Sequence, residues 1–153
     1  MATLRPMSEV EFADFRKAET AAYAEDRARN VGTSVEEELE EANRWFSEVL
    51  AEGLRTPNQR FRVVVEDDNV ARGYLWVDVN EQQQYAWIFS LEIKAEHRGK
   101  GYGRQALELL EDELRPLGIK RIGLNVFADN TIARHLYTKV GYQITNYNMH
   151  KSL

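Results

Sequence analysis

The sequence predicts an α/β fold with one central mixed sheet (an α+β arrangement) and helices on both faces, in the order β-α-α-β-β-β-α-β-α-β. Two observations support it. An antiparallel meander of β-branched and aromatic runs is followed by alternating helical and strand patterns, and no linker or low-complexity segment interrupts them. The 153 residues, 43% of them hydrophobic, suffice for one core. A single domain over residues 1–153 is therefore expected.

The first part of the chain predicts a short strand and two helices. Apolar residues at positions 2–4 precede Ser8 and Glu11, a capping-box pattern for a helix from about Glu9 into the twenties. Ser34 and Glu37 repeat that pattern ahead of a second amphipathic helix. Its apolar residues recur at helical spacing until Gly53: Leu39, Ala42, Trp45, Phe46, Val49 and Leu50.

The middle of the chain predicts a three-stranded antiparallel meander. Residues 61–65 and 70–79 are rich in β-branched and aromatic side chains and flank the turn at residues 67–69. A third run, Tyr85–Ile93, follows a polar turn at residues 80–84.

The remainder predicts two helices alternating with two strands. Gly103 opens the first helix, and residues 121–127 form the next strand. Asn130 can cap the second helix, which Gly141 ends at the left-handed position beyond its last turn. Residues 142–149 are expected to close the chain as a final strand.

Composition excludes several functional classes. The absence of cysteine removes disulfides, thiolate metal sites and any acyl-cysteine intermediate. A net charge of -5, without an extended basic face, disfavours nucleic acid as a partner. No apolar run is long enough to cross a membrane, and the first residues lack a secretory pattern. A cytoplasmic protein that needs no metal is expected.

A glycine-rich, basic loop between the third meander strand and the next helix is the clearest candidate binding site. Its residues are Arg98, Gly99, Lys100, Gly101, Tyr102, Gly103 and Arg104. Glycines let the backbone approach a ligand closely, and a helix start directs free N–H groups and a partial positive charge at one point. This arrangement favours a phosphate ligand over a purely structural turn.

Two common phosphate loops fit this segment poorly. A Walker loop requires a Gly-Lys-Ser/Thr sequence, which is absent. Residues 101–106 match the dinucleotide fingerprint, but the following strand ends in Asn125, Val126 and Phe127 where an acidic ribose partner is expected. A nucleotide-binding oxidoreductase is therefore disfavoured.

A second motif gives the loop a family context. Arg98-x-x-Gly101-x-Gly103 is followed by Asn130-x-x-Ala133-x-x-Leu136-Tyr137-x-x-Val140-Gly141-Tyr142. This pair of motifs resembles the GCN5-related N-acetyltransferase (GNAT) family over residues 60–150, and the element order agrees. The resemblance implies an acetyl-CoA-binding part at about residues 85–142 and acceptor-side helices at about residues 8–53.

The resemblance also implies which residues bind acetyl-CoA. The loop from Arg98 to Arg104 would cradle the pyrophosphate through its backbone N–H groups. Main-chain groups of Leu91 and Ile93 would contact the pantetheine arm. Residues of the last helix would lie beside the cofactor: Asn130, Ala133 and Tyr137.

Without cysteine, this resemblance implies direct transfer of the acetyl group to a bound amine in a ternary complex. Tyr137 is the candidate acid for the leaving sulfur, although the residue alone also suits a core aromatic. Glu92 is the candidate base. Its presence is explained equally well if it is an outward-facing strand residue or the ion-pair partner of a nearby arginine. Desolvation or a water chain could also remove the amine proton.

The acceptor is expected to be a primary amine of a small molecule or a peptide. Residues 1–60 hold 13 acidic and 8 basic side chains, which favours a cationic acceptor but also suits solvated helix faces. Tyr23 and Glu25 are the local candidates for binding an ammonium group. The sequence leaves open whether the chain forms a homodimer. The alternative function is a non-catalytic CoA-binding or regulatory module on the same fold.

Overall fold

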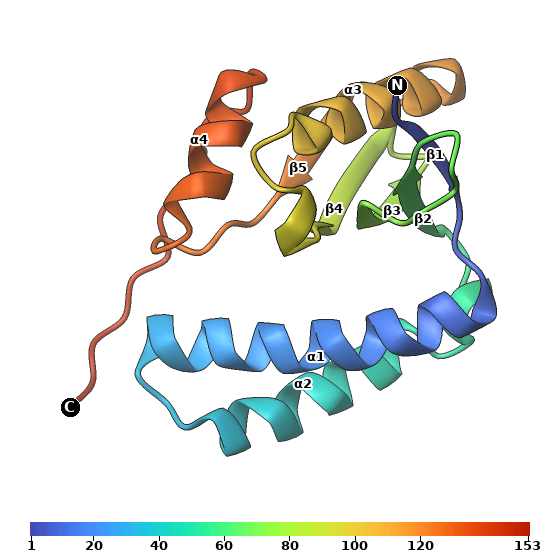
Figure 1. The fold of residues 1–153 in the computed structure, drawn as a ribbon. Coiled ribbons are helices and arrows are strands. Elements are labelled where there is room, and N and C mark those ends of the chain that lie inside the picture. Colours follow the sequence, from blue (N-terminus) through green and yellow to red (C-terminus); the bar gives the residue numbers. More distant parts are fainter. The chain divides into compact units, whose positions relative to one another are not determined.

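The structure, a computed structural model, describes residues 1–153 and divides into two compact units. The first unit contains Met1–Ala13 and Glu52–Asn125, and the second contains Asp14–Ala51 and Val126–Leu153. All five strands and the helix at residues 102–114 belong to the first unit. The helix at residues 9–31 begins in the first unit and continues in the second, whose regular structure is helical (Figure 1). The two units are described separately below.

The first unit is built on one five-stranded mixed sheet with the strand order β1-β2-β3-β4-β5. Adjacent strands are antiparallel from β1 to β4, whereas β4 and β5 are parallel. The predicted mixed sheet and meander are therefore confirmed. The strands are β1 (Thr3–Pro6), β2 (Gln59–Val65), β3 (Gly73–Asn80), β4 (Tyr85–Ile93) and β5 (Arg121–Leu124).

Four α-helices accompany the sheet: α1 (Glu9–Val31), α2 (Val35–Val49), α3 (Tyr102–Leu114) and α4 (Thr131–Lys139). Both predicted capping signals form. The Ser8 hydroxyl accepts from the N–H of Glu11 at 3.2 Å, while the Ser8 N–H donates to the Glu11 carboxylate at 2.9 Å. The Ser34 hydroxyl accepts from the N–H of Glu37 at 3.2 Å, which starts α2 where the sequence predicts it.

The sheet of the first unit is covered on two faces, because successive side chains of a strand alternate. On one face Arg62 is paired with Glu113 of α3, and Val64 packs with Ala106 of α3. On the other face the ring of Phe61 contacts Phe12 of α1 at 4.9 Å between centroids and stacks on Trp76 at 5.7 Å. The alternating pattern of β2 thus builds two apolar layers.

The predicted final strand is absent. Residues 142–153 contain neither helix nor strand, so the observed order ends with α4. Strand β5 also ends at Leu124 rather than at residue 127. A strand exists only where its backbone groups pair with a neighbour, and residues 143–153 are exposed without a ladder partner. The alternating apolar residues of this segment, such as Ile144, therefore do not by themselves make it a strand.

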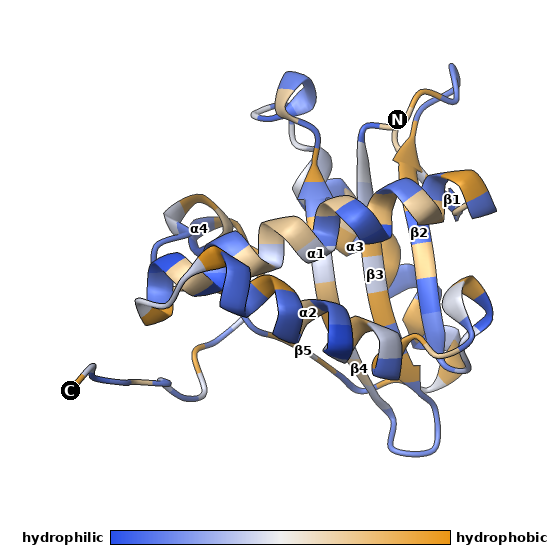
Figure 2. Ribbon diagram, turned by 90° about the horizontal axis from the view of Figure 1, so that it is seen from below, coloured by the Kyte–Doolittle hydropathy of each residue, from blue (hydrophilic) through white to orange (hydrophobic).

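Helix α2 carries all its acidic residues except the buried Glu38 on an exposed surface. Glu36 and Glu37 lie in its first turn and are exposed, while Ala42 and Phe46 are buried. Figure 2 shows the mainly hydrophilic colouring of α2. None of the helices combines the length and apolar character needed to span a membrane.

Glu11 is expected to make the first unit sensitive to acid. Its carboxylate accepts from both terminal nitrogens of Arg5, at 2.7 and 2.9 Å, and the Arg5 hydrogen bonds lower the pKa of Glu11 to about 2. A carboxylate with a lowered pKa stabilises the fold above its ordinary pKa, and this stabilisation is lost as pH falls from about 4.5 towards 2. Glu11→Gln should cost about 1–3 kcal/mol at pH 7.

Chemical denaturation of both proteins between pH 7 and pH 3 measures this effect. The difference in unfolding free energy between wild type and Glu11→Gln should shrink as pH falls. Glu9→Gln, an exposed change in the same helical turn, is the matched control. A difference independent of pH would contradict the assigned role of the Arg5–Glu11 pair.

Candidate functional site

The second half of β4 has one edge without a partner strand. Strand β5 pairs with β4 only from Tyr85 to Ile88, although β4 continues to Ile93. The pairing with β3 shifts at this same place: Val77 pairs with Ile88 and Trp76 with Ser90, so Phe89 is an extra, bulged residue. No strand pairs with this edge of β4 from Ser90 to Ile93, so an extended ligand could pair there, and the Ile93 carbonyl meanwhile accepts from Arg98 at 2.8 Å.

Gly73 permits the close approach of β3 to the end of β4. A Cβ at this position would lie 2.4 Å from the carbonyl oxygen of Glu92 and 2.7 Å from a side-chain carbon of Ile93. Every other residue type would therefore push the strands apart. The position of Glu92 and Ile93 depends on this glycine.

The loop after β4 ends in an uncapped helix start. Gly99 and Gly101 have φ angles of 72° and 85°, the left-handed region that favours glycine. Gly101 is the N-cap of α3 and supplies no side chain, and the first turn holds no acidic residue. The N–H groups of Tyr102, Gly103 and Arg104 therefore point out of the first turn towards any bound anion. This geometry fits a pyrophosphate.

The basic side chains of the loop make local contacts. Arg98 donates to the carbonyl of Ile93 at 2.8 Å, and Lys100 donates to the carbonyl of Glu96 at 3.2 Å. Arg104 pairs with Glu108 one turn along α3 at 2.8 Å. These exposed contacts are weak, so the side chains can be redirected. The three basic side chains are thus bonded within the loop and α3, and anion binding by the backbone N–H groups of this segment stays a prediction.

Glu92 lies on the sheet face opposite α3. Its cross-strand partner is Tyr74, which shares a face with Trp76, whereas Leu91 packs in the apolar cluster beside α3. The Glu92 carboxylate is half exposed and lies 3.8 Å from the guanidinium of Arg98. It is thus accessible to an incoming amine and also has an arginine partner, so both interpretations of the residue find support.

The second unit carries the predicted residues of α4. The Asn130 side chain accepts from the N–H of Ala133 at 3.1 Å, which confirms Asn130 as the helix cap. The preceding residue, Asp129, is held by Arg29 and by Asn30 at the end of α1. These contacts fix the start of α4 within this unit.

Tyr137 is mostly buried and keeps its proton. Its ring contacts that of Tyr142 at 5.6 Å between centroids. Burial raises the pKa of Tyr137 to about 12. The hydroxyl is therefore protonated throughout the physiological pH range, as an acid for a leaving group must be.

The second unit also contains an open, partly aromatic cavity of about 160 Å³. Tyr23 lines it and is stacked on Trp45 at 6.2 Å between centroids. Glu25 is exposed and is not among the lining residues, so the predicted Tyr23–Glu25 pair does not form one site. The lining residues are Tyr23, Arg27, Glu38, Glu41, Ala42 and Trp45.

The buried position of Glu38 in this cavity differs from the solvated helix face that its run of glutamates suggests. Glu38 is buried and bonded to Arg27 at 2.9 Å and to Thr33 at 2.6 Å. Its signal was present: Glu38 precedes Ala42 and Phe46 by four and eight residues, the spacing of one helical face. A run of consecutive glutamates concealed that periodicity.

Comparisons with known proteins agree with this geometry. Residues 21–142 match the family model described as "Acetyltransferase (GNAT) family". The chain belongs to the GNAT acetyltransferase family. The predicted resemblance is thereby confirmed.

Several GNAT relatives resemble the chain along almost its whole length. The uncharacterized N-acetyltransferase YycN of Bacillus subtilis (strain 168) is 34% identical, and the match covers 98% of this chain and 97% of YycN. YdgE of the same strain, also named an uncharacterized N-acetyltransferase, is 33% identical over 99% of this chain and 98% of YdgE.

Solved GNAT structures confirm the fold. The crystal structure of YycN has a TM-score of 0.94 at 32% identity and covers 100% of this chain and 99% of YycN. The PaiA N-acetyltransferase of Thermoplasma acidophilum, solved in complex with coenzyme A, has a TM-score of 0.67 at 19% identity. That match covers 97% of this chain and 93% of PaiA, and it supports the fold alone.

Gly73→Ala should loosen the end of β4 in this GNAT chain. The added methyl group would overlap the Glu92 carbonyl, and overpacking of this kind costs about 1–3 kcal/mol. Thermal unfolding should show a lower Tm. The comparison variant is Gly118→Ala, which adds a methyl group with nothing within 4 Å and so measures only the strain of its left-handed φ of 77°; the loss in Gly73→Ala should be larger. Equal losses in the two variants would argue against the close approach as the cause.

Proposed function

We propose that the protein is an N-acetyltransferase that uses acetyl-CoA and transfers the acetyl group directly to a primary amine in a ternary complex. The observation that carries this proposal is the open edge of β4 leading into the uncapped start of α3. Membership of the GNAT family and the coenzyme A complex of PaiA support the same donor.

The residues of the first unit suit two chemically different parts of acetyl-CoA. Backbone N–H groups at residues 99–104 would accept the pyrophosphate, because the positive-φ glycines and the helix start gather donors without a competing carboxylate. The free edge at Leu91 and Ile93 would pair with the amide groups of the pantetheine arm. The donor supplies a thioester whose carbonyl carbon is open to attack by an amine.

Proton transfers accompany the exchange of bonds. Glu92, directly or through water, would remove a proton from the ammonium form of the amine, since an alkylamine is mostly protonated near neutral pH. The amine nitrogen would then form the new bond to the acetyl carbon while the carbon–sulfur bond breaks and Tyr137 donates its hydroxyl proton to the departing sulfur. The nitrogen would give up its second proton as the amide forms, and a proton from solvent would restore the Tyr137 hydroxyl. The absence of cysteine rules out a cysteine-bound acetyl group.

The acceptor is proposed to be cationic. The acidic excess of residues 1–60 would attract a positively charged amine from a distance. The cavity of the second unit does not itself carry this proposal. Its Glu38 carboxylate is paired with Arg27, which also lines the cavity, and its Glu41 carboxylate is paired with Arg44.

Coenzyme A release across a panel of amines tests this function directly. Polyamines, amino sugars and basic peptides should support turnover, whereas neutral and acidic amines should be poor acceptors because the acidic face repels or fails to attract them. Double-reciprocal lines at varied acetyl-CoA should intersect, as a ternary complex requires. Parallel lines would contradict direct transfer. Binding of coenzyme A without turnover on any amine would favour the non-catalytic module.

Tyr137→Phe should lower kcat by about 10²-fold and leave the KM for acetyl-CoA nearly unchanged, because only a proton donor is removed. Steady-state kinetics between pH 7 and pH 10 measure both constants. Because burial raises the pKa of Tyr137 to about 12, the wild-type rate should not fall in this range through loss of the tyrosine proton. Tyr147→Phe, a change at an exposed tyrosine, is the control. An unchanged kcat would exclude Tyr137 as the acid.

A further inference from the structure

Arg72 is the one buried basic side chain of the chain, with 8% of its surface exposed. It lies just before β3, and its backbone is fixed on both sides. The Arg72 N–H donates to the carbonyl of Val64 at 2.7 Å, and the Arg72 carbonyl accepts from the N–H of Lys94 at 2.9 Å. The Arg72 side chain is therefore attached to a part of the backbone that is held firmly in the sheet.

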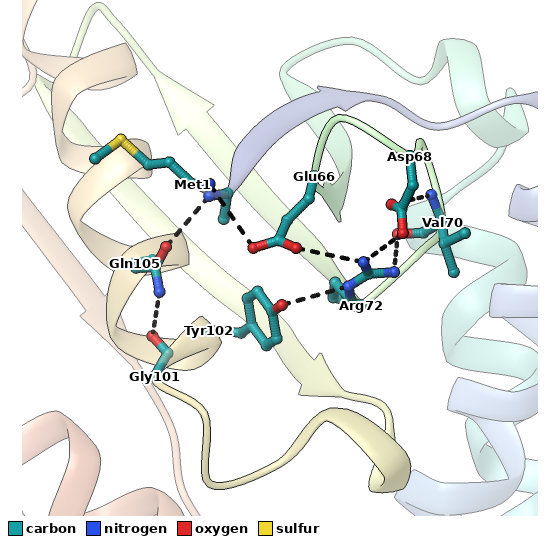
Figure 3. A network of polar contacts seen from close by, with 9 residues as sticks. Met1, Glu66, Asp68, Val70, Arg72, Gly101, Tyr102 and Gln105 are labelled. Carbon is teal, nitrogen blue, oxygen red and sulfur yellow. Dashed lines mark hydrogen bonds and ion pairs between the residues drawn. The ribbon is translucent and has the colours of Figure 1, made fainter.

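The guanidinium of Arg72 joins two segments that are far apart in sequence (Figure 3). One terminal nitrogen donates to Asp68 at 2.6 Å and to Glu66 at 3.4 Å, both in the turn between β2 and β3. The other terminal nitrogen donates to the carbonyl of Val70 at 3.1 Å. The Nε atom donates to the hydroxyl of Tyr102, the first residue of α3, at 3.4 Å.

Other side-chain contacts also hold the start of α3. The Gln105 side chain accepts from the N–H of Ala2 at 3.3 Å and donates to the carbonyl of Gly101 at 3.4 Å, as Figure 3 shows. The Tyr102 ring packs beside the cluster of Ala2, Val64 and Ala106. The last part of the loop is thus held by side chains, whereas Gly99 and Gly101 have none to hold it.

The turn between β2 and β3 has hydrogen bonds of its own in addition to the three that it receives from Arg72. The N–H of Asn69 donates to the carbonyl of Glu66 at 2.9 Å, and Asp68 accepts from the N–H of Val70 at 3.0 Å. These bonds close the turn from within. The contact of Arg72 with Tyr102 has its effect on the loop instead, because it fixes the residue that donates the first free N–H of α3.

We propose that Arg72 and Tyr102 form a positioning pair that holds the phosphate-binding loop in its anion-binding conformation before the ligand arrives. This inference rests on the proposed function of the loop. Ordering a glycine-containing loop costs conformational entropy, and a loop already ordered binds its ligand more tightly. Arg72 acts through Tyr102 and does not itself contact the pyrophosphate, because its charge is matched by Asp68 and Glu66.

The test measures equilibrium binding of coenzyme A by calorimetry, the kinetic constants, and thermal unfolding. Tyr102→Phe removes one hydroxyl and keeps the ring in its apolar cluster, so the Tm should change little. The Kd for coenzyme A and the KM for acetyl-CoA should rise about three- to tenfold, with kcat changed less than about twofold. Tyr147→Phe, the same chemical change at an exposed position, should alter none of these values.

A second variant shows whether the two residues act together. Arg72→Lys keeps a cation beside Asp68 but lacks the fork that also reaches Tyr102, so its Kd should rise by a similar factor. The double variant should then bind no more weakly than the weaker single variant. The proposed pair would be contradicted if the losses of binding free energy in the two single variants added up in the double variant. It would also be contradicted if Tyr102→Phe bound coenzyme A with the wild-type Kd. A wild-type protein that binds no coenzyme A would instead overturn the proposed function.

Discussion

The bulge at Phe89 is the constraint on which the candidate site depends. From Tyr85 to Ile88, β4 pairs with β3 on one edge and with β5 on the other. Beyond Phe89 it still pairs with β3 but no longer with β5. The extra residue also exchanges the faces of the strand, because side chains alternate with a period of two. Without it, Glu92 would share the face of Ile88 and point towards α3. With it, Glu92 lies beside Tyr74 on the opposite face, half exposed. One inserted residue thus opens a backbone edge and exposes a carboxylate.

The loop that follows depends on the same strand end. Gly73 lets β3 approach Glu92 and Ile93, and the backbone of Arg72 bonds that of Lys94 directly beyond them. The buried guanidinium of Arg72 then reaches Tyr102 at the other end of the loop. Both ends of the proposed phosphate-binding segment are therefore anchored near the start of β3. Free N–H groups directed by a rigid anchor bind an anion better than mobile charges do, and the loop's basic side chains are bonded elsewhere.

The sequence predicts correctly the features that depend on contacts between residues close together in the chain. The caps Ser8, Ser34 and Asn130 bond residues three positions away, so their signals lie within one helical turn and all three form. The bulge at Phe89 could not be predicted, because it is a register between two strands rather than a property of either. The same holds for the absent strand at residues 142–149, and for Arg72, whose partner Tyr102 lies 30 positions along the chain.

The second unit holds its proposed acid by different means. Helix α4 has nine residues and none is fully buried, so its length and its packing are weak constraints on its position. Its start is fixed by the Asn130 cap and by Asp129, which is bound to Arg29 and Asn30; the Arg29 hydrogen bond lowers the pKa of Asp129. Polar contacts at one end therefore determine where Tyr137 stands, while burial of its ring keeps the hydroxyl protonated. The proposed anion site relies on a rigid sheet, and the proposed proton donor relies on polar contacts at one end of a helix. The two can respond separately to substitution.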